Sequence, residues 1–281
     1  DGLKIKEIIK RGPFAVKKNE VTPGSIIEKI DGTDIKAGED YNALLDGKAG
    51  KNIRLTIKNA KGKRFDLTIK AISQGAQQEL LYKRWVDRNR AIVDSVSHGR
   101  IAYVHVKAMN SESFRTVYSE LLSEKNRTKD AVIVDERHNG GGWLHDDLCT
   151  LLSGKQYQEF VPHGKVVGKD PFNKWTKPSC VLICEDDYSN GHGFPWVYKE
   201  LGIGKLIGAP VAGTMTAVWW ETLMDRSLVF GIPQVGCRDM RGTFGENTTL
   251  QPDIEVYNSP EDYITGHDTQ LIRAVEEMMK K

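Results

Sequence analysis

The chain has 281 residues, of which 39% are hydrophobic and 28% charged, and its formal net charge at pH 7 is +2. This composition is typical of an ordinary globular protein with enough chain for two domains. The near-neutral charge argues against a nucleic-acid partner, and no apolar stretch approaches the ~20 residues of a membrane span.

Cysteine usage gives little sign of a metal or disulfide framework. The four cysteines are Cys149, Cys180, Cys184 and Cys237, and their spacing fits no metal-ligand motif. Cys180 and Cys184 lie in one strand-like run at a separation of roughly 13 Å, which is too far for a disulfide. We therefore expect buried free thiols, weak support for a reducing compartment, and no metal or other cofactor.

The first 72 residues are predicted to form a small, mostly-β domain. Alternating apolar residues predict strands over 3–9, 25–30, 53–57 and 65–69. A short helix is expected at 41–45, before a hairpin formed by the last two strands. This order resembles a PDZ domain of the bacterial protease type, which binds peptide termini by adding a strand to a sheet edge. A generic small β domain is the alternative.

Residues 73–98 form a polar and charged connector, for which we expect a helix or an extended arm. From residue 99 onward, strands alternate with helices. Strands are predicted at 101–106, 131–135, 180–184 and 206–208, and helices at 111–123, 143–152, 193–201 and 268–280. Continuous apolar strands between helices indicate an α/β domain with a largely parallel sheet. The apolar stretches 218–220 and 228–233 are expected to be antiparallel strands packed on the core.

Two turns carry most of the functional signal, and each follows a buried strand. Gly140, Gly141 and Gly142 leave backbone N–H groups open to close approach. Ser189 stands where the next strand passes into a helix. Because sites form at the carboxyl ends of parallel strands, we expect these turns to share one site. A nucleophile beside backbone donors is the arrangement that acyl transfer needs.

Each turn also has a simpler interpretation. Ser189 by itself could be an N-cap serine. The glycine turn could be a helix entry or a phosphate cradle. Nucleotide binding is disfavoured because neither a Lys-Ser/Thr pair nor the spacing Gly-x-Gly-x-x-Gly is present.

A serine needs a base before it can act as a nucleophile. His138 is next to the glycine turn and His192 lies one helical turn past Ser189, but neither has an orienting carboxylate at a recognisable spacing. Lys199 and Lys205 are poorly placed for a Ser–Lys dyad. The residues therefore predict a nucleophile and an oxyanion hole without an evident base.

Several segments in order resemble the tricorn-type serine proteases, which belong with the C-terminal processing peptidases. They are 85–90, 99–106, 135–142, 189–194, 202–208, 246–247 and 252–256. The resemblance spans almost the whole chain and implies a crotonase/Clp-protease-like α/β catalytic domain after the PDZ-like domain. It suggests a PDZ-like domain at 1–72, a connector at 73–98 and a serine peptidase catalytic domain at 99–281.

The resemblance also assigns roles to individual residues. Ser189 takes the place of the nucleophile, and Gly142 and Asn190 match the positions whose backbone N–H groups form the oxyanion hole. Asn190 departs from the aspartate usual in the family, a change that a backbone donor tolerates. Glu246 matches the glutamate that helps to orient the catalytic histidine.

Substrate-binding roles fall on Gly141 and on Glu159, which stands near the place of the family's acidic specificity residue. The family's catalytic histidine follows a serine in a helical domain upstream of the PDZ domain. We therefore expect it before Asp1, and interpret Ser97-His98 as a coincidence. In place of the lysine of the processing peptidases, this sequence has Gly213-Thr214-Met215, which argues against a Ser–Lys mechanism.

These residues together predict a serine endopeptidase that hydrolyses oligopeptides or unfolded proteins. The resemblance implies a homo-oligomer, and this chain alone is expected to be inactive or weakly active. The compartment, cytoplasmic or periplasmic, stays open. A catalytically degenerate peptide-binding module is the alternative, because Asn190 and His192 stand where the family favours acidic residues. A crotonase-like acyl-CoA enzyme would share the fold, but the PDZ-like domain disfavours it.

Overall fold

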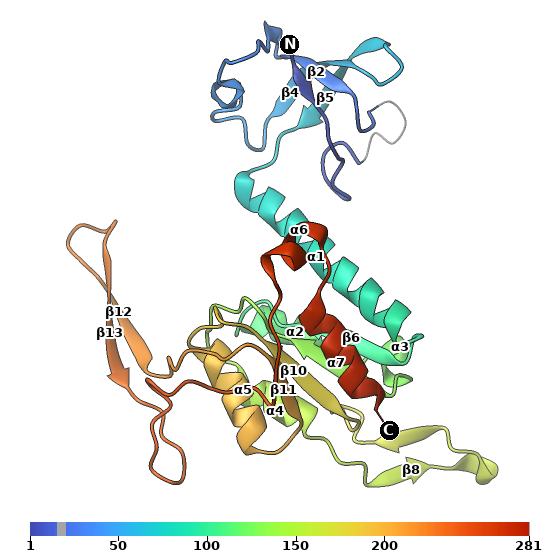
Figure 1. Ribbon diagram of the computed structural model, residues 1–281, viewed down its shortest axis with the longest axis vertical. Helices are drawn as coiled ribbons and strands as arrows, with labels where there is room; N and C mark the ends of the chain where they lie inside the picture. The colour runs from blue at the N-terminus through green and yellow to red at the C-terminus, as the bar shows by residue number, and fades with distance from the viewer. Residues whose placement is uncertain (16–20, 281) are drawn as a thin grey trace. The chain divides into compact units, whose positions relative to one another are not determined.

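The computed structural model describes residues 1–15 and 21–280, and the chain divides into two compact units, residues 1–88 and 89–281. Figure 1 shows the first unit in blue and the second in green to red. Among the described residues, no helix is both long and apolar enough to cross a bilayer.

The first unit is a five-stranded antiparallel sheet; the sequence predicted four of its strands, missed the two-residue strand at 33–34 and made the first strand too long. The strand order is β1-β2-β4-β5, with β3 paired to β2. Ile53, Leu55 and Ile57 point from β4 into the core of this unit, where Phe65 and Leu67 of β5 pack against them. The elements are β1 (Leu3–Lys4), β2 (Ile26–Ile30), β3 (Thr33–Asp34), the 3₁₀ helix η1 (Tyr41–Leu44), β4 (Asn52–Lys58) and β5 (Arg64–Lys70).

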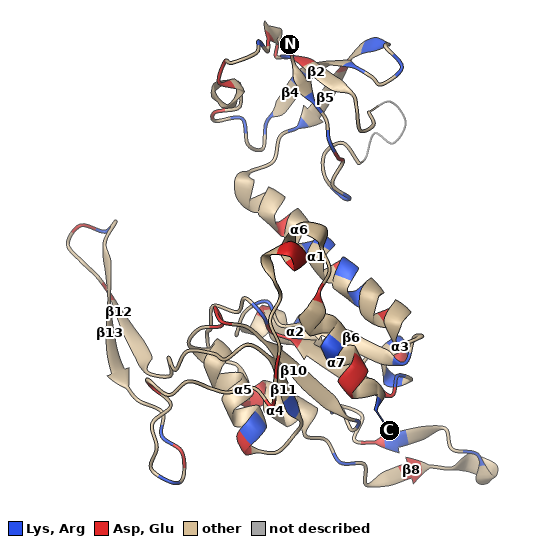
Figure 2. Cartoon of the chain, viewed as in Figure 1, with Lys and Arg blue, Asp and Glu red and all other residues tan. Residues whose placement is uncertain are grey.

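The predicted connector is a helix, α1 (Gln74–Val96). Both basic and acidic residues are spread along it (Figure 2), so most of its surface suits water. The division between the two units falls inside this helix, after Arg88. In the second unit, Val93 and Asn89 are buried, and the Asn89 amide donates a hydrogen bond to the Tyr103 hydroxyl at 3.3 Å. The three-part division at 72 and 98 stays a prediction.

The second unit is built on a five-stranded sheet with the order β14-β11-β10-β7-β6, in which every pair is parallel. The predicted strands β6, β7 and β10 are buried at every position because helices cover both faces of the sheet. The strands are β6 (Ile101–His105), β7 (Ala131–Asp135), β10 (Ser179–Ile183), β11 (Lys205–Gly208) and β14 (Ile254–Glu255).

Helices cover the two faces of this sheet differently. On one face α7 lies against β6, β7, β10 and β11. On the other, alternate strand residues such as Val134 and Val181 share a core with Leu148 of α4 and Phe194 of α5. Figure 1 shows α4 and α5 side by side beneath the sheet. The helices of this unit are α2 (Ser111–Leu121), α3 (Glu124–Arg127), α4 (His145–Leu152), α5 (Asn190–Glu200), α6 (Pro260–Thr265) and α7 (Thr269–Met279).

The strands predicted after residue 213 exist, but their expected packing on the core is wrong. β12 (Ala217–Thr222) and β13 (Val229–Val235) pair into a hairpin that projects from the second unit in Figure 1. Trp219, Trp220 and Phe230 are each more than half exposed. A run of apolar residues indicates that a segment packs against some other surface. It does not tell whether that segment joins the core of the same domain or stays exposed on a projecting hairpin.

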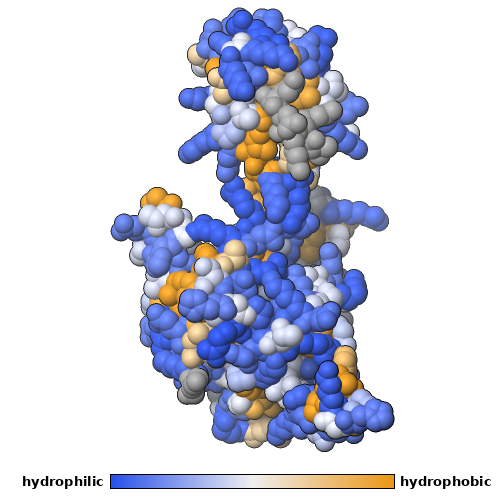
Figure 3. All heavy atoms as spheres, turned by 90° about the vertical axis from the view of Figure 1, so that its right-hand side faces the viewer, coloured by the Kyte–Doolittle hydropathy of each residue, from blue (hydrophilic) through white to orange (hydrophobic). Residues whose placement is uncertain are grey.

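A second ribbon, formed by β8 (Gln158–Phe160) and β9 (Gly168–Asp170), also extends from the unit, with η2 (Pro162–Gly164) between its strands. Phe160 and Val167 are exposed on or beside it. The face shown in Figure 3 is mostly hydrophilic, with separate small hydrophobic areas. The chain therefore concentrates its exposed apolar residues in a few projecting segments.

Candidate active site

The glycine turn follows β7 at the carboxyl edge of the sheet. It is held against residue 109, because Met109 N–H donates to Gly141 O at 3.0 Å and Trp143 N–H donates to Met109 O at 2.7 Å. Gly142 has a φ of 134°, and a Cβ there would lie 2.1 Å from Met109 O. Only glycine fits this position. Among the described residues, the Gly142 amide has no hydrogen-bond partner.

The serine turn follows β10, the neighbour of β7, and meets the glycine turn directly. Tyr188 N–H donates to Asn139 O at 2.9 Å, and Asn139 N–H donates to the Asp187 carboxylate at 3.1 Å. Gly141 has a φ of 95°, and its ideal Cβ would lie 2.6 Å from the Cβ of Ser189. The predicted meeting of the two turns is therefore what the structure shows.

Ser189 itself has an unusual backbone. Its φ is 56° and its ψ is −119°, a conformation that costs a non-glycine residue roughly 1–3 kcal/mol. It precedes the first residue of α5 but makes no side-chain cap hydrogen bond, so the N-cap interpretation does not explain the serine. Its N–H donates to Thr214 Oγ1 at 3.0 Å. The described residues offer its hydroxyl no hydrogen-bond partner.

Asn190 has a side-chain role that the sequence did not reveal. Its Oδ1 accepts hydrogen bonds from the N–H groups of Leu144 at 2.7 Å and His145 at 3.1 Å, at the start of α4. Its Nδ2 lies 2.8 Å from His145 Nδ1. The side chain thus links the start of α4, which follows the glycine turn, to α5, which follows the serine turn. Its own backbone N–H, in the first turn of α5, has no partner among the described residues.

Glu246 lies on a loop beside these turns. Its Oε2 accepts a hydrogen bond from Thr216 N–H at 2.7 Å. Burial pushes the pKa of Glu246 upward, but the hydrogen bonds from Thr216 and Met215, with the nearby His192, together place the pKa below its ordinary value. The carboxylate is therefore ionised at neutral pH.

One cavity of about 460 Å³ brings these groups together. Five of the six predicted site residues line it, namely Gly141, Gly142, Ser189, Asn190 and Glu246. Three aromatic residues of the lining, Trp143, Tyr188 and Trp220, are more than half exposed. An open cavity with aromatic side chains and backbone donors suits an extended, partly apolar ligand.

Glu159, the sixth predicted residue, lies elsewhere. It is in β8, on the exposed β8–β9 ribbon, and is not among the residues that line the cavity. Its Oε1 pairs with Lys169 at 3.3 Å and accepts from Gln156 at 3.2 Å. Its role in specificity stays a prediction.

None of the basic side chains considered from the sequence bonds the Ser189 hydroxyl. His192 is fully buried, and neither ring nitrogen has a partner among the described residues. Burial lowers the pKa of His192, and Glu246 opposes this only in part. Lys199 pairs with Asp253 at 3.1 Å, which directs it away from the serine.

His145 is a cavity residue that the sequence analysis missed. It is the first residue of α4, where it contacts Asn190 and stacks edge-on against Trp143 with ring centroids 5.2 Å apart. Its place three residues after Gly142, at the start of a predicted helix, was the available signal. Its distance in sequence from Ser189 concealed the contact.

A buried ionic network anchors β7 from the other face of the sheet. Arg137 pairs with Asp135 at 2.7 Å and with Asp268 at 2.9 Å, and the Tyr103 hydroxyl donates to Asp135 at 2.8 Å. Burial would raise the pKa of Asp135, but the charge and hydrogen bonds of Arg137 hold it below its ordinary value. The network thus fixes the end of β7, where the glycine turn begins, to the N-terminus of α7.

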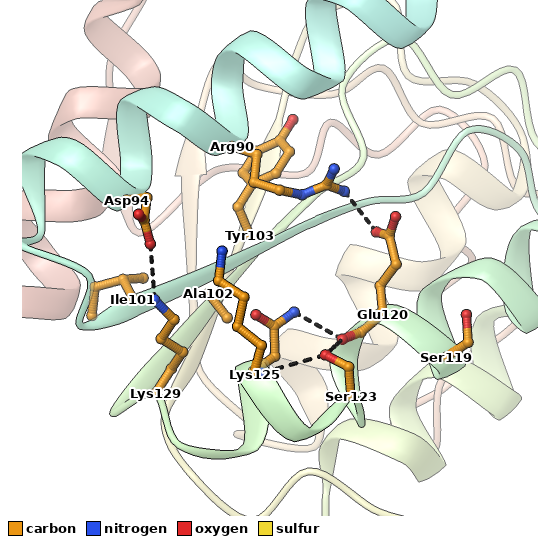
Figure 4. Close-up of a pocket in the computed structure, with 11 residues that line it drawn as sticks. Arg90, Asp94, Ile101, Ala102, Tyr103, Ser119, Glu120, Ser123, Lys125 and Lys129 are labelled. Atoms are coloured by element: carbon orange, nitrogen blue, oxygen red, sulfur yellow. Dashed lines mark hydrogen bonds and ion pairs between the residues drawn. The ribbon is translucent and has the colours of Figure 1, made fainter.

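Another hollow in the second unit shows no comparable chemistry. Figure 4 shows it between α1 and the α2–α3 segment, with Arg90 paired to Glu120 and Lys129 paired to Asp94. Each of these cations faces its own carboxylate, so the hollow has no cluster of free positive charge among the residues drawn. In the first unit, an apolar cavity of about 670 Å³ is lined by Ile8, Phe14 and Ile69, among others.

The fold defines a parallel α/β domain preceded by a mostly-β, PDZ-like unit. Two family models match these regions: that of the tricorn protease PDZ domain covers residues 6–74, and that of peptidase family S41 covers residues 100–256. The second match takes in more than half of the chain. The chain therefore belongs to peptidase family S41.

Similar proteins agree with this assignment. The chain is 28% identical to the tricorn protease of Thermoplasma acidophilum over 92% of its own length and 24% of that protein. It is 32% identical to a putative tricorn-like protease C-terminal subunit of Sulfurisphaera tokodaii, over 72% of this chain and 24% of that one. A crystal structure of the tricorn protease superposes with a TM-score of 0.83 at 27% identity, covering 97% of this chain and 27% of the other. The chain thus spans about a quarter of these proteins.

Proposed function

We propose that the chain contributes the serine nucleophile and the oxyanion hole of an endopeptidase that acts on oligopeptides or unfolded proteins. The observation that carries this proposal is the contact between Gly141 and Ser189, with a Cβ separation of 2.6 Å for the ideal glycine position. The contact supports the proposal because Ser189 lies beside backbone at Gly141 and Gly142 where a Cβ would clash, so the amides there stay uncovered.

In this mechanism, Ser189 Oγ attacks the scissile carbonyl and the serine proton passes to a base. The N–H groups of Gly142 and Asn190 then donate to the oxyanion, a contribution worth roughly 3–4 kcal/mol per donor in serine hydrolases. Both amides lack partners among the described residues, as a preorganised hole requires. The acyl-enzyme is hydrolysed by water, with the base returning the proton.

The base in this proposal is a histidine outside the 281 residues. Among the described residues, no histidine or lysine nitrogen bonds the Ser189 hydroxyl, although Ser189 lines an open cavity. Glu246 lines the same cavity as an ionised carboxylate, suited to orient an imidazolium. Substrate contact falls on Gly141 and, as a prediction, on Glu159.

Two experiments test the proposal. A protein that also carries the proposed upstream histidine should label at Ser189 with a fluorophosphonate and cleave unfolded protein, and Ser189→Ala should abolish both. Residues 1–281 alone should cleave at least ~10³-fold more slowly, because the base is missing. Fast cleavage by residues 1–281 that Ser189→Ala removes would show that a local base such as His145 or His192 acts instead.

The alternative is a degenerate module that binds peptides without cleaving them. One observation favours it: His192, which stands where the resemblance favours an acidic residue, is buried, and its ring nitrogens have no partner among the described residues. Peptide binding by a protein that carries the proposed upstream histidine, with no fluorophosphonate adduct, would support this alternative. The apolar cavity of the first unit offers a place for a peptide in either case.

A further inference from the structure

A second cluster of reactive side chains lies at the same edge of the sheet, outside the proposed catalytic cavity. His138 Nδ1 is 3.0 Å from both oxygens of the Asp186 carboxylate. Cys184 Sγ is 2.8 Å from Asp186 Oδ1 and 3.8 Å from His138 Nδ1. From this geometry we propose that His138, Cys184 and Asp186 form a binding site for a zinc-like transition-metal ion.

The separations suit a metal with a small adjustment. In a tetrahedral zinc site, bond lengths of about 2.0–2.3 Å put neighbouring ligand atoms roughly 3.4–3.6 Å apart. The three ligand atoms here all lie within 4.8 Å of one another, with the printed pairs at 2.8–3.8 Å. The two shortest contacts need to open by less than 1 Å when a metal replaces the shared proton.

The donor set selects the class of ion. A sulfur, an imidazole nitrogen and a carboxylate oxygen are the ligands of Zn²⁺ and of similar ions such as Co²⁺. Calcium and magnesium prefer all-oxygen sites, so a cysteine at the centre disfavours them. Three protein ligands leave one tetrahedral position for water or an added ligand.

The surroundings prepare the sulfur for a metal. His138 N–H donates to Cys184 Sγ at 3.2 Å, a hydrogen bond that stabilises a thiolate. Cys184 is buried, whereas the side chains of His138 and Asp186 are 50% and 66% exposed, so solvent reaches the cluster from one side. On binding, the thiol proton leaves to solvent and the Zn–S bond forms, with no change in oxidation state.

The buried thiol is a poor candidate for other chemistry. Burial raises the pKa of Cys184, and the charge of Asp187 raises it further, so the thiol is not a free nucleophile at neutral pH. A bound cation is the group that reverses this effect, because it favours the thiolate directly. No sequence motif marks the cluster, because His138 and Cys184 lie 46 residues apart and meet only through the pairing of β7 with β10.

The position of the cluster suggests what the metal does. His138 directly precedes Asn139, whose backbone binds Tyr188 and Asp187 in the serine turn. Asp186 lies three residues before Ser189. A metal ion bound to residues of both turns would link the turns from outside the catalytic cavity. It would stabilise this edge of the sheet without contacting the nucleophile.

The binding test uses metal ions without any other added ligand. Metal-free protein is titrated with Zn²⁺ by calorimetry and with Co²⁺ by absorption, where a cobalt–thiolate band reports the sulfur ligand. We expect one equivalent to bind, Cys184→Ser to remove the thiolate band, and His138→Gln and Asp186→Asn each to weaken binding at least ~10-fold. Zn²⁺ should also raise the Tm of the wild type more than that of the three variants.

Matched controls come from the same chain. Cys237→Ser and His163→Gln alter a cysteine and a histidine outside the cluster, and they should bind Zn²⁺ like the wild type. If Cys184→Ser does not fold, the two exposed variants decide the question. Absence of saturable binding, or binding unchanged in His138→Gln and Asp186→Asn, overturns the proposal. No readout depends on peptidase activity, so this outcome is separate from that of the proposed function.

Discussion

An added Cβ on Gly141 would lie 2.6 Å from the Cβ of Ser189 and 2.8 Å from Tyr188 O. The glycine turn and the serine turn can therefore lie this close together only because residue 141 has no side chain. Gly140, the preceding residue, has open space where a Cβ would go. The two glycines are a matched pair for experiment.

Gly141→Ala should displace the serine turn and, in a protein that carries the proposed upstream histidine, reduce fluorophosphonate labelling by at least ~10-fold, because a 1 Å misplacement can cost about 10²-fold. It should also destabilise the fold by roughly 1–3 kcal/mol, since φ is 95° at this residue. Urea unfolding measures the second effect. Gly140→Ala is the control and should change neither quantity; equal effects of both variants would contradict this account.

The effect of replacing Asn190 on stability should depend on whether the new side chain keeps a hydrogen-bond acceptor. Asn190→Ala leaves two N–H groups of α4 without their acceptor and should cost about 1–2 kcal/mol in unfolding free energy. Asn190→Asp keeps an acceptor at the same place and should lose less. Thermal and urea unfolding compare the variants. An aspartate as damaging as alanine would show that the acceptor role is minor.

The buried network at the end of β7 should be worth more than a surface pair. Arg137→Leu leaves the fully buried Asp135 without its positively charged partner and should destabilise the chain by about 3–5 kcal/mol. The control is Arg100→Leu, which removes an exposed pair with Asp130 and should cost at most ~1 kcal/mol. The measurement is the midpoint of denaturant unfolding, compared between variants whose unfolding curves have the same slope. Comparable losses in the two variants would refute the anchoring role.

Glu277 should make stability depend on pH in the acid range. Hydrogen bonds from Lys205 and Lys280 lower its pKa from 4.5 to about 2. A carboxyl whose pKa is lowered by folding stabilises the native state above its unfolded pKa, and this contribution is lost as pH falls from about 4.5 to about 2.

The matching variant is Glu277→Gln. It should destabilise the chain by about 1–2 kcal/mol at pH 7, a value reduced for solvent screening, and by almost nothing near pH 2. Unfolding curves across this range compare it with the wild type. A difference that does not shrink on acidification would mean that packing of the side chain, and not its charge, is responsible.

The sequence predicted the parallel sheet well for a physical reason. Strands such as Ala131–Asp135 are buried on both faces, so they read as continuous apolar runs that end sharply at the turns. The meeting of Gly141 with Ser189 followed from the rule that the carboxyl ends of such strands share one edge. At these positions the local apolar pattern and the order of strands in the sheet lead to the same prediction.

Other features depended on contacts that no local pattern encodes. Trp219 and Trp220 look like core residues in sequence, yet they lie on a projecting hairpin. The side chain of Asn190 caps a helix whose first residue lies 45 positions earlier. Such relationships arise from the order of strands in the sheet, so they appear only once β7 and β10 are known to be neighbours.

The positive φ of Ser189 has a consequence for how this chain can change. Glycine accepts a φ of 56° without strain, so Ser189→Gly should not suffer the conformational cost that the serine bears. Selection for stability alone would therefore favour glycine over serine at position 189, so the serine is held there against its own backbone preference.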